Sequence, residues 1–241
     1  MIRIGTSGWT YRHWKGNFYP EGLSQRNWLE YYSENFSTVE INATFYHIPT
    51  VQTTRGWSER TPGTFRFSVK ASRLITHVHR LEDCQDTVDW FFRSMEPMRK
   101  KTIAYLFQLP PSFCPDYQFL DDFLARLPGG NRCVLELRNP DCTTDALLNT
   151  LETHGVGFCI HDYSGRQSPL LITGDTVYLR FHGFQARYAG SYPHEVLGQW
   201  AERIGEWAAQ GKDVLAYFNN DLDGSAVRNA LSLRAMVDCA L

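Results

Sequence analysis

The amino-acid sequence predicts an α/β protein folded as a (β/α)8 TIM barrel, and three observations support this. The chain has 241 residues, close to the roughly 250 of an undecorated barrel. Eight strand-like runs alternate with helix-like runs along it, which is typical of parallel βαβ units. The loops that lead from a strand to the next helix are longer than the loops that lead from a helix to the next strand. We therefore expect residues 1–241 to form a single barrel domain.

The expected strands share a high content of Val, Ile, Leu, Phe and Tyr. They are Arg3–Thr6, Thr38–Asn42, Phe65–Lys70, Ile103–Gln108, Cys133–Arg138, Gly157–Asp162, Val177–His182 and Val214–Asn219. Apolar residues at helical spacing indicate the helices, as in the stretch that Pro193 opens and Gly211 ends. Between Asp162 and Val177 there is little room for a helix, so we expect a degenerate sixth helix. The alternative, an open doubly wound sheet, lacks a GxGxxG turn after the first strand.

The composition excludes several classes of protein. Hydrophobic residues make up 43% of the chain and the formal net charge is −2. These values predict a full core and no broad basic surface for nucleic acid. No apolar run reaches the length of a membrane span, and no secretory signal pattern opens the chain. The six cysteines form no CxxC pair, which indicates reduced thiols in a cytoplasmic protein. We expect no membrane partner, and the sequence leaves the oligomeric state open.

The unequal joins indicate where the function lies. Long segments follow several expected strands, namely Ser7–Leu23, Ala43–Val51, Ala71–Leu81 and Gly183–Tyr192. The returns to the next strand are short, as in Thr61–Thr64 and Gln210–Asp213. Long loops at one end of a barrel build the site at its carboxyl-terminal mouth.

Alternation along the strands predicts a polar set that points into this mouth. In the run Val39–Asn42, for example, the apolar pair should face the helices, which leaves Glu40 and Asn42 inside. The candidates from all strands are Glu40, Asn42, Lys70, Gln108, Glu136, Arg138, Asp162 or His161, Arg180, His182 and Asn219. A purely structural ion network is the alternative. A hydrophobic plug would stabilise the barrel as well or better, so we favour binding or catalysis.

The balance of positive and negative charges among these residues indicates whether a metal ion binds. Three carboxylates (Glu40, Glu136, Asp162) stand against three cations (Lys70, Arg138, Arg180). A metal site normally shows a surplus of carboxylates and imidazoles that offsets the charge of the metal. We therefore predict no cofactor, and a divalent metal is not favoured.

Aromatic side chains are frequent in the first two loops. Trp9 and Tyr46 are candidates for a wall that stacks on a ring, whereas Phe18 and Phe45 are expected to pack as core. Tyr188, in the loop Gly183–Tyr192, could belong to a mobile lid. Asn220 extends the polar end of the eighth strand as a further binding candidate.

The motifs also resemble a known family. Gly5-Thr6-Ser7-Gly8-Trp9, Val39-Glu40-Ile41-Asn42, Phe67-Ser68-Val69-Lys70-Ala71, Phe107-Gln108-Leu109-Pro110-Pro111, Glu136-Leu137-Arg138, Arg180-Phe181-His182-Gly183 and Phe218-Asn219-Asn220-Asp221 occur in order over nearly the whole chain. They resemble the YecE-like family, domain of unknown function 72. The resemblance implies a TIM barrel and implies no activity. The family tends to carry a tryptophan soon after the arginine of the Glu-Leu-Arg motif, whereas this chain has Asn139-Pro140-Asp141-Cys142.

The leading functional hypothesis is a hydrolase or lyase that acts on a small anionic, phosphate-bearing molecule with a ring. Lys70, Arg138 and Arg180 would hold the anion, and Trp9 or Tyr46 the ring. Glu136 or Asp162 would be the base and His182 the acid. Asn42, Gln108, Tyr188, Asn219 and Asn220 complete the expected substrate contacts.

Three alternatives remain at this stage. A glycosidase would use Glu40 and Glu136 as its pair of carboxylates. A non-catalytic module would keep the mouth for a ligand. A metal-dependent phosphodiesterase would act on nucleic acid, although the acidic overall balance does not favour that partner. Fold alone does not separate these functions.

Overall fold

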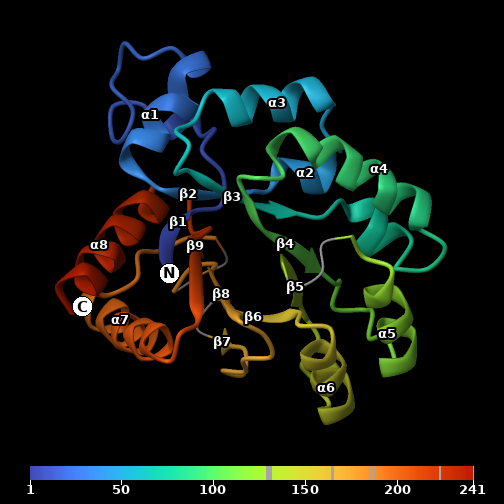
Figure 1. Ribbon diagram of the computed structural model, residues 1–241. Coiled ribbons are helices and arrows are strands. Elements are labelled where there is room, and N and C mark those ends of the chain that lie inside the picture. Colours follow the sequence, from blue (N-terminus) through green and yellow to red (C-terminus); the bar gives the residue numbers. More distant parts are fainter. Residues whose placement is uncertain (129–131, 164–165, 185, 187, 223, 241) are drawn as a thin grey trace.

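The chain forms a parallel α/β barrel with helices outside the strands (Figure 1). The computed structural model describes residues 1–128, 132–163, 166–184, 186, 188–222 and 224–240. The barrel strands are β1 (Ile2–Thr6), β2 (Thr38–Ile41), β3 (Arg66–Lys70), β4 (Thr102–Gln108), β5 (Cys133–Glu136), β6 (Gly157–Tyr163), β8 (Thr176–Phe181) and β9 (Asp213–Phe218). Each matches one expected run to within a few residues at its ends. The predicted barrel is confirmed.

The barrel is nearly closed. Parallel pairing runs in the order β1-β9-β8-β6-β5-β4-β3-β2. The seam between β1 and β2 is bridged by Ser7 and Glu40, and the amide of Gly8 donates to the Glu40 carbonyl at 2.8 Å. Gly5 permits this approach, because a Cβ there would lie 2.4 Å from the Thr38 carbonyl oxygen. The closed seam rules out an open doubly wound sheet.

The helices lie between successive strands. They are α1 (Trp28–Asn35), α2 (Ala43–Tyr46), α3 (Val51–Glu59), α4 (Gln85–Met95), α5 (Tyr117–Ala125), α6 (Asp145–Thr153), α7 (His194–Ala209) and α8 (Ser225–Ala240). Side-chain caps begin three of them, since Thr50 accepts from the Thr53 amide, Asp116 from the Phe119 amide and Thr144 from the Leu147 amide. Between β6 and β8, the described residues form the short antiparallel strand β7 (Arg166–Gln167) on β6 and no helix. The expected degenerate sixth unit is confirmed.

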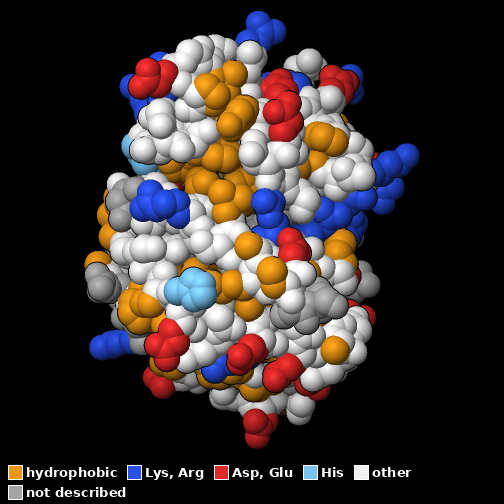
Figure 2. Space-filling model, turned by 90° about the vertical axis from the view of Figure 1, so that its left-hand side faces the viewer, with side chains coloured by type: hydrophobic (Ala, Val, Ile, Leu, Met, Phe, Trp, Pro, Cys, Tyr) orange, Lys and Arg blue, Asp and Glu red, His pale blue; other side chains and the backbone are white. Residues whose placement is uncertain are grey.

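The surface carries charges of both signs. Figure 2 shows the side with α1, α7 and α8, where acidic and basic side chains are interspersed and neither sign covers the face. Within the described residues, no helix is both long enough and apolar enough to span a bilayer.

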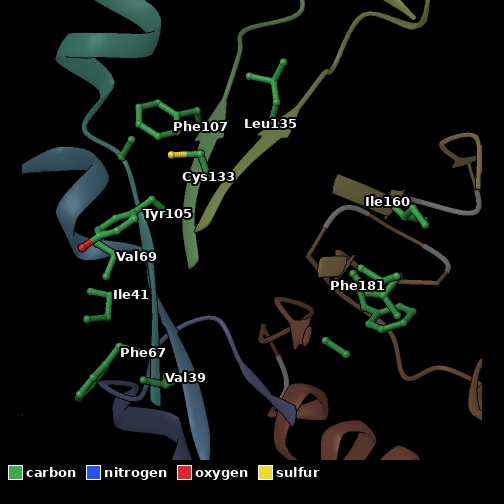
Figure 3. Packing of buried hydrophobic residues seen from close by; sticks show 14 of the residues in the cluster. Val39, Ile41, Phe67, Val69, Tyr105, Phe107, Cys133, Leu135, Ile160 and Phe181 are labelled. Atoms are coloured by element: carbon green, nitrogen blue, oxygen red, sulfur yellow. The ribbon is translucent and has the colours of Figure 1, made fainter. Parts of the chain in front are cut away.

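The core follows the strand alternation that the sequence predicts. Figure 3 shows outward-facing residues two positions apart on neighbouring strands: Val39 and Ile41, Phe67 and Val69, Tyr105 and Phe107, and Cys133 and Leu135. A second cluster fills the barrel interior with Ala104, Leu106, Val134, Cys159, Tyr178, Leu215 and Tyr217. The residues that continue this inward parity toward the strand ends therefore reach the mouth.

The cysteines depart in part from expectation. Cys114 and Cys142 form a disulfide, with 5.3 Å between their Cα atoms, that joins the β4–α5 loop to the β5–α6 loop. The expectation of reduced thiols is wrong for this pair. Cys84, Cys133, Cys159 and Cys239 are free.

Candidate functional site

Two adjacent cavities open at the carboxyl ends of the strands. The first, here the aromatic cavity, has a volume of about 520 Å³. Its lining includes five predicted residues, Asn42, Tyr46, Lys70, Tyr188 and Asn219, and four that were not assigned, Tyr11, His13, Phe45 and Asp221. The second, here the arginine cavity, has about 460 Å³ and is lined by Arg138 and Arg166 together with Gln108, His161 and Tyr163. Tyr188 lines both cavities.

A buried ion network lies beneath the cavities. Arg180, which is 1% exposed, donates through Nη2 to Glu40 Oε1 at 2.8 Å and through Nη1 to Glu136 Oε2 at 2.6 Å. Both glutamates are fully buried. Ser7 and Tyr178 donate to the two oxygens of Glu40 at 2.6 and 2.8 Å. Because Arg180 is enclosed by these partners, it orients the two carboxylates and does not reach a ligand directly.

The network continues upward through Arg138. Its Nε pairs with Glu136 Oε1, and its Nη2 lies 2.8 Å from His182 Nε2. Burial alone would raise the pKa of Glu136, but the cations Arg138 and Arg180 outweigh it and hold that pKa well below its ordinary value. Glu136 is therefore ionised, and both its oxygens are engaged.

His182 does not suit the predicted role of acid. Burial lowers its pKa well below the ordinary value, and the cations Arg180 and Arg138 lower it further. A guanidinium only donates, so Nε2 of the neutral ring accepts from Arg138. The other ring nitrogen, Nδ1, lies 3.2 Å from Asn219 Nδ2. His182 thus orients Arg138 and is uncharged at neutral pH, so the acidic imidazolium form is not present to act as a general acid.

Lys70 is a buried cation of the mouth to which the described residues supply no carboxylate within ion-pair distance. Its Nζ donates to Gln108 Oε1 at 2.6 Å and lies 4.2 Å from the centre of the Phe45 ring. Burial, with the nearby charge of Arg180, lowers the pKa of Lys70 to about 7. Phe45, expected in the core, instead lines the cavity beside this amine.

An unpredicted pair lies in the same cavity. His13 Nε2 is 2.9 Å from Asp221 Oδ2, and Trp14 Nε1 donates to Asp221 Oδ1 at 2.7 Å. His13 is 42% exposed and Asp221 8%. Asp221 ends the motif Phe218-Asn219-Asn220-Asp221, and His13 lies four residues after the motif that ends at Trp9. However, 207 positions separate Trp14 from Asp221. Nothing local indicates that the two segments meet.

Three predicted residues lie elsewhere. Asp162 faces outward, like its register partner Phe181, and forms a hydrogen bond with the Tyr192 hydroxyl. His161 is the residue of this strand end that faces inward, beside its register partner Arg180. Asn220 is fully buried and donates to the Gly190 carbonyl and to Asn229 Oδ1, both at 2.9 Å, so it fastens a loop. Trp9 packs edge-on against Trp57, 5.6 Å between centroids, and is absent from the described linings of both cavities.

The loop after β8 carries Tyr188 into the mouth. Gly183 begins it at φ +115°, where a Cβ would lie 2.3 Å from the Ala186 carbonyl oxygen. Tyr188 itself has φ 61°, and its ring packs 5.6 Å from His182. Residues 185 and 187 of this loop lie outside the described residues. The expected lid movement stays a prediction.

Comparison with known proteins gives the family. The family model described as "Protein of unknown function DUF72" matches residues 3–240. The chain belongs to this family. The UPF0759 protein YunF of Bacillus subtilis (strain 168) is 28% identical to the DUF72 chain over 272 residues, covering 99% of the chain and 95% of YunF.

Solved DUF72 structures have the same fold. A DUF72 family protein from Thermotoga maritima MSB8 superposes with a TM-score of 0.88 at 30% identity, covering 99% of both chains. Another, from Enterococcus faecalis V583, gives 0.84 at 22% identity over 99% of this chain and 96% of that one. These comparisons support the TIM-barrel family assigned from the motifs and name no activity. In the described part of this DUF72 chain, no three His, Cys, Asp or Glu side chains group as metal ligands would.

Proposed function

We propose that the mouth of this barrel is an enzyme site of hydrolase or lyase type for a small anionic molecule that carries a ring. The observation that carries the proposal is the position of Lys70 and the His13–Asp221 pair on one cavity, beside a second cavity lined by Arg138. Groups that exchange protons thus lie next to groups that hold an anion.

The charge balance supports an anionic ligand. Asp162 faces outward, so the carboxylates of the two cavities and of the network beneath them are Glu40, Glu136 and Asp221. They stand against four cationic side chains, Arg138, Arg166, Arg180 and Lys70. Within the described chain, the polar contacts of Arg138 use Nε and Nη2, which leaves Nη1 for a ligand. A guanidinium oriented in this way suits phosphate or carboxylate.

The ring would lie in the aromatic cavity. Tyr46 is 65% exposed there, and Phe45 and Tyr11 contribute further faces. Tyr46 thus keeps its expected role, while Phe45 replaces Trp9. Aromatic faces stack on flat ligands at modest cost in side-chain entropy.

The proton-transfer roles are reassigned by the contacts. Glu40, Glu136 and His182 are saturated, and we give them the task of orienting Arg180 and Arg138. His13, oriented by Asp221, is the proposed general base, and Lys70 is the proposed partner that holds or releases a proton near neutral pH.

The other candidate functions have less support. A glycosidase needs two carboxyl groups that reach the bond from either side, whereas Glu40 and Glu136 are both buried and bridged by Arg180. A nucleic-acid phosphodiesterase would gain from a continuous basic surface, which the formal net charge of −2 does not favour. A non-catalytic binding module would also bind a ligand at the mouth, so only a turnover assay distinguishes it from an enzyme.

A turnover screen tests the proposal. Phosphoesters, phosphorylated aldehydes and ketones, and glycosides are assayed with wild type, Lys70→Met and His13→Gln, with the surface changes Lys100→Met and His194→Gln as matched controls. We expect turnover of an anionic ring compound that falls by about 10²–10⁴-fold in the two cavity variants and persists in the controls. Equal turnover by all five proteins places the active site elsewhere. Saturable binding with no turnover across the screen supports the binding module.

A further inference from the structure

The environment of Lys70 goes beyond that of an anion-holding side chain. Its side chain is 8% exposed, and a buried ammonium normally requires a carboxylate partner. The nearby carboxylates are already committed, Glu40 to Arg180 and Glu136 to both arginines. The partners of Nζ are instead a neutral amide oxygen of Gln108 and the face of Phe45. Glu136 and Glu40 act on the amine only from beyond ion-pair distance, and the charges of Arg180 and Arg138 oppose them.

The amine is also placed for attack. Lys70 is the last residue of β3, and its side chain points into the barrel. It lines the aromatic cavity, which has a volume of about 520 Å³. Gln108 and Phe45 restrain the flexible stem from two sides. The unprotonated form of an amine oriented in this way is a nucleophile toward carbonyl carbon.

We propose that Lys70 is a covalent nucleophile that forms an imine with an aldehyde or ketone group of the anionic substrate. This inference rests on the proposed function and narrows it to lyase chemistry on a carbonyl compound. The reaction classes that fit are those in which an imine accepts the electron pair of a breaking C–C or C–H bond, which a hydrolase has no need of.

The step balances without an external reagent. The lone pair of Nζ forms the C–N bond, and the π electrons of the carbonyl move to oxygen, which takes up a proton while nitrogen loses one. A second proton, taken up from solvent, converts the hydroxyl of the carbinolamine to water, which leaves as the nitrogen lone pair forms the C=N bond of the protonated imine. His13, on the same cavity, is placed to carry the protons between nitrogen and oxygen. Hydrolysis by the reverse path returns free Lys70.

Reductive trapping tests the inference. The probe is pyridoxal 5′-phosphate, an aldehyde with a ring and a phosphate, and sodium borohydride is the reductant that converts an imine to a stable secondary amine. The chain contains five lysines, Lys15, Lys70, Lys100, Lys101 and Lys212, so peptide mass spectrometry assigns every adduct. At neutral pH we expect Lys70 to be modified at least about tenfold faster than any of the other four, because an ordinary lysine is almost fully protonated there. The other lysines serve as internal controls that need no refolded variant.

Pyridoxine 5′-phosphate separates the two proposals, because it keeps the ring and phosphate but has no carbonyl. We expect it to compete with the aldehyde and slow the modification of Lys70 alone. Competition together with preferential modification of Lys70 supports both proposals. Saturable binding of pyridoxine 5′-phosphate without preferential modification of Lys70 overturns the imine and leaves the anion site standing. If pyridoxine 5′-phosphate does not bind and Lys70 is not preferentially modified, both the imine and the anion site are overturned. Lys70→Arg, which keeps the charge but forms no imine, should bind pyridoxine 5′-phosphate and give no adduct in the β3 peptide.

Discussion

Arg180 and Glu40 form an ion pair of 2.8 Å inside the barrel, with exposed fractions of 1% and 0%. The same guanidinium reaches Glu136 at 2.6 Å, so one cation bridges two buried carboxylates that come from strands β2 and β5. The pair therefore links folding of the barrel to the geometry of its mouth. Removing a partner from such a network costs more than the network contributes, because an uncompensated charge stays buried.

Arg180→Met should consequently destabilise the fold. We expect a loss of about 3–5 kcal/mol in the free energy of unfolding, measured by urea denaturation. Arg55→Ala on exposed α3 is the matched control and should stay within about 0.5 kcal/mol of wild type. A loss below 1 kcal/mol for Arg180→Met would mean that the two glutamates do not depend on this arginine.

The sequence predicted the barrel and the inward parity because both follow from local alternation. Glu40, Lys70, Glu136 and Arg138 sit where period-two alternation along their strands put them. At the end of β6 the alternation left two candidates for the inward-facing residue, Asp162 and His161. Asp162 was preferred, but it faces outward, and His161 faces inward. The expected position of Asp162 in the mouth was wrong for that reason.

The contacts that decide the roles could not be predicted, because they join segments far apart in the chain. Arg138 and His182 meet across 44 positions, and that contact together with burial makes His182 a neutral acceptor where the sequence indicated an acid. In the sequence, Asn220 extends the polar end of the last strand, which indicated a ligand contact. Its side chain instead binds Asn229 on α8. The disulfide likewise depends on how two loops approach.

His182 should stay neutral over the range in which a free histidine titrates. Burial and the two arginines lower its pKa, so its imidazole proton resonance should not shift between pH 8 and about 5.5, although an ordinary histidine has a pKa of about 6.5. Two-dimensional NMR of the imidazoles measures this, and His182→Gln assigns the signal. A midpoint near 6.5 would show that Arg138 and Arg180 do not control this ring.

Lys70 should make the stability of the fold increase with pH. The unfolded chain keeps the Lys70 proton until about pH 10.4, whereas the folded chain loses it near its pKa of about 7. Between these values the unfolded state binds more protons, so raising the pH stabilises the fold by at most about 1.4 kcal/mol per unit.

Lys70→Met provides the reference for that measurement. The groups that face Lys70 are Glu40, Glu136, Arg138, Arg180 and His77, and they are present in both proteins. The variant should be more stable than wild type at pH 7, and the difference should shrink toward pH 10 in chemical denaturation. A difference that does not change with pH would contradict the lowered pKa.

Reduction should weaken the protein through Cys114 and Cys142. Their bond closes a loop with a sequence separation of 28, for which loss of loop-closure entropy predicts a contribution of about 3–4 kcal/mol. We expect a lower Tm in the presence of a phosphine reductant, and no response to the reductant in Cys114→Ser. Alkylation of Cys114 in the folded, unreduced protein, alongside the exposed Cys239, would show that the bond is not formed.

Binding of phenyl phosphate, measured by isothermal titration calorimetry, tests the anionic ring site most directly. Wild type and the control Arg55→Ala should bind it with the same Kd, and the uncharged benzyl alcohol should bind far more weakly. Arg138→Ala should raise the Kd by about 10–100-fold, since hydrogen bonds to charged groups contribute about 1.5–3 kcal/mol. Equal Kd values for wild type and Arg138→Ala, or equal affinity for the charged and uncharged rings, would contradict the proposed site.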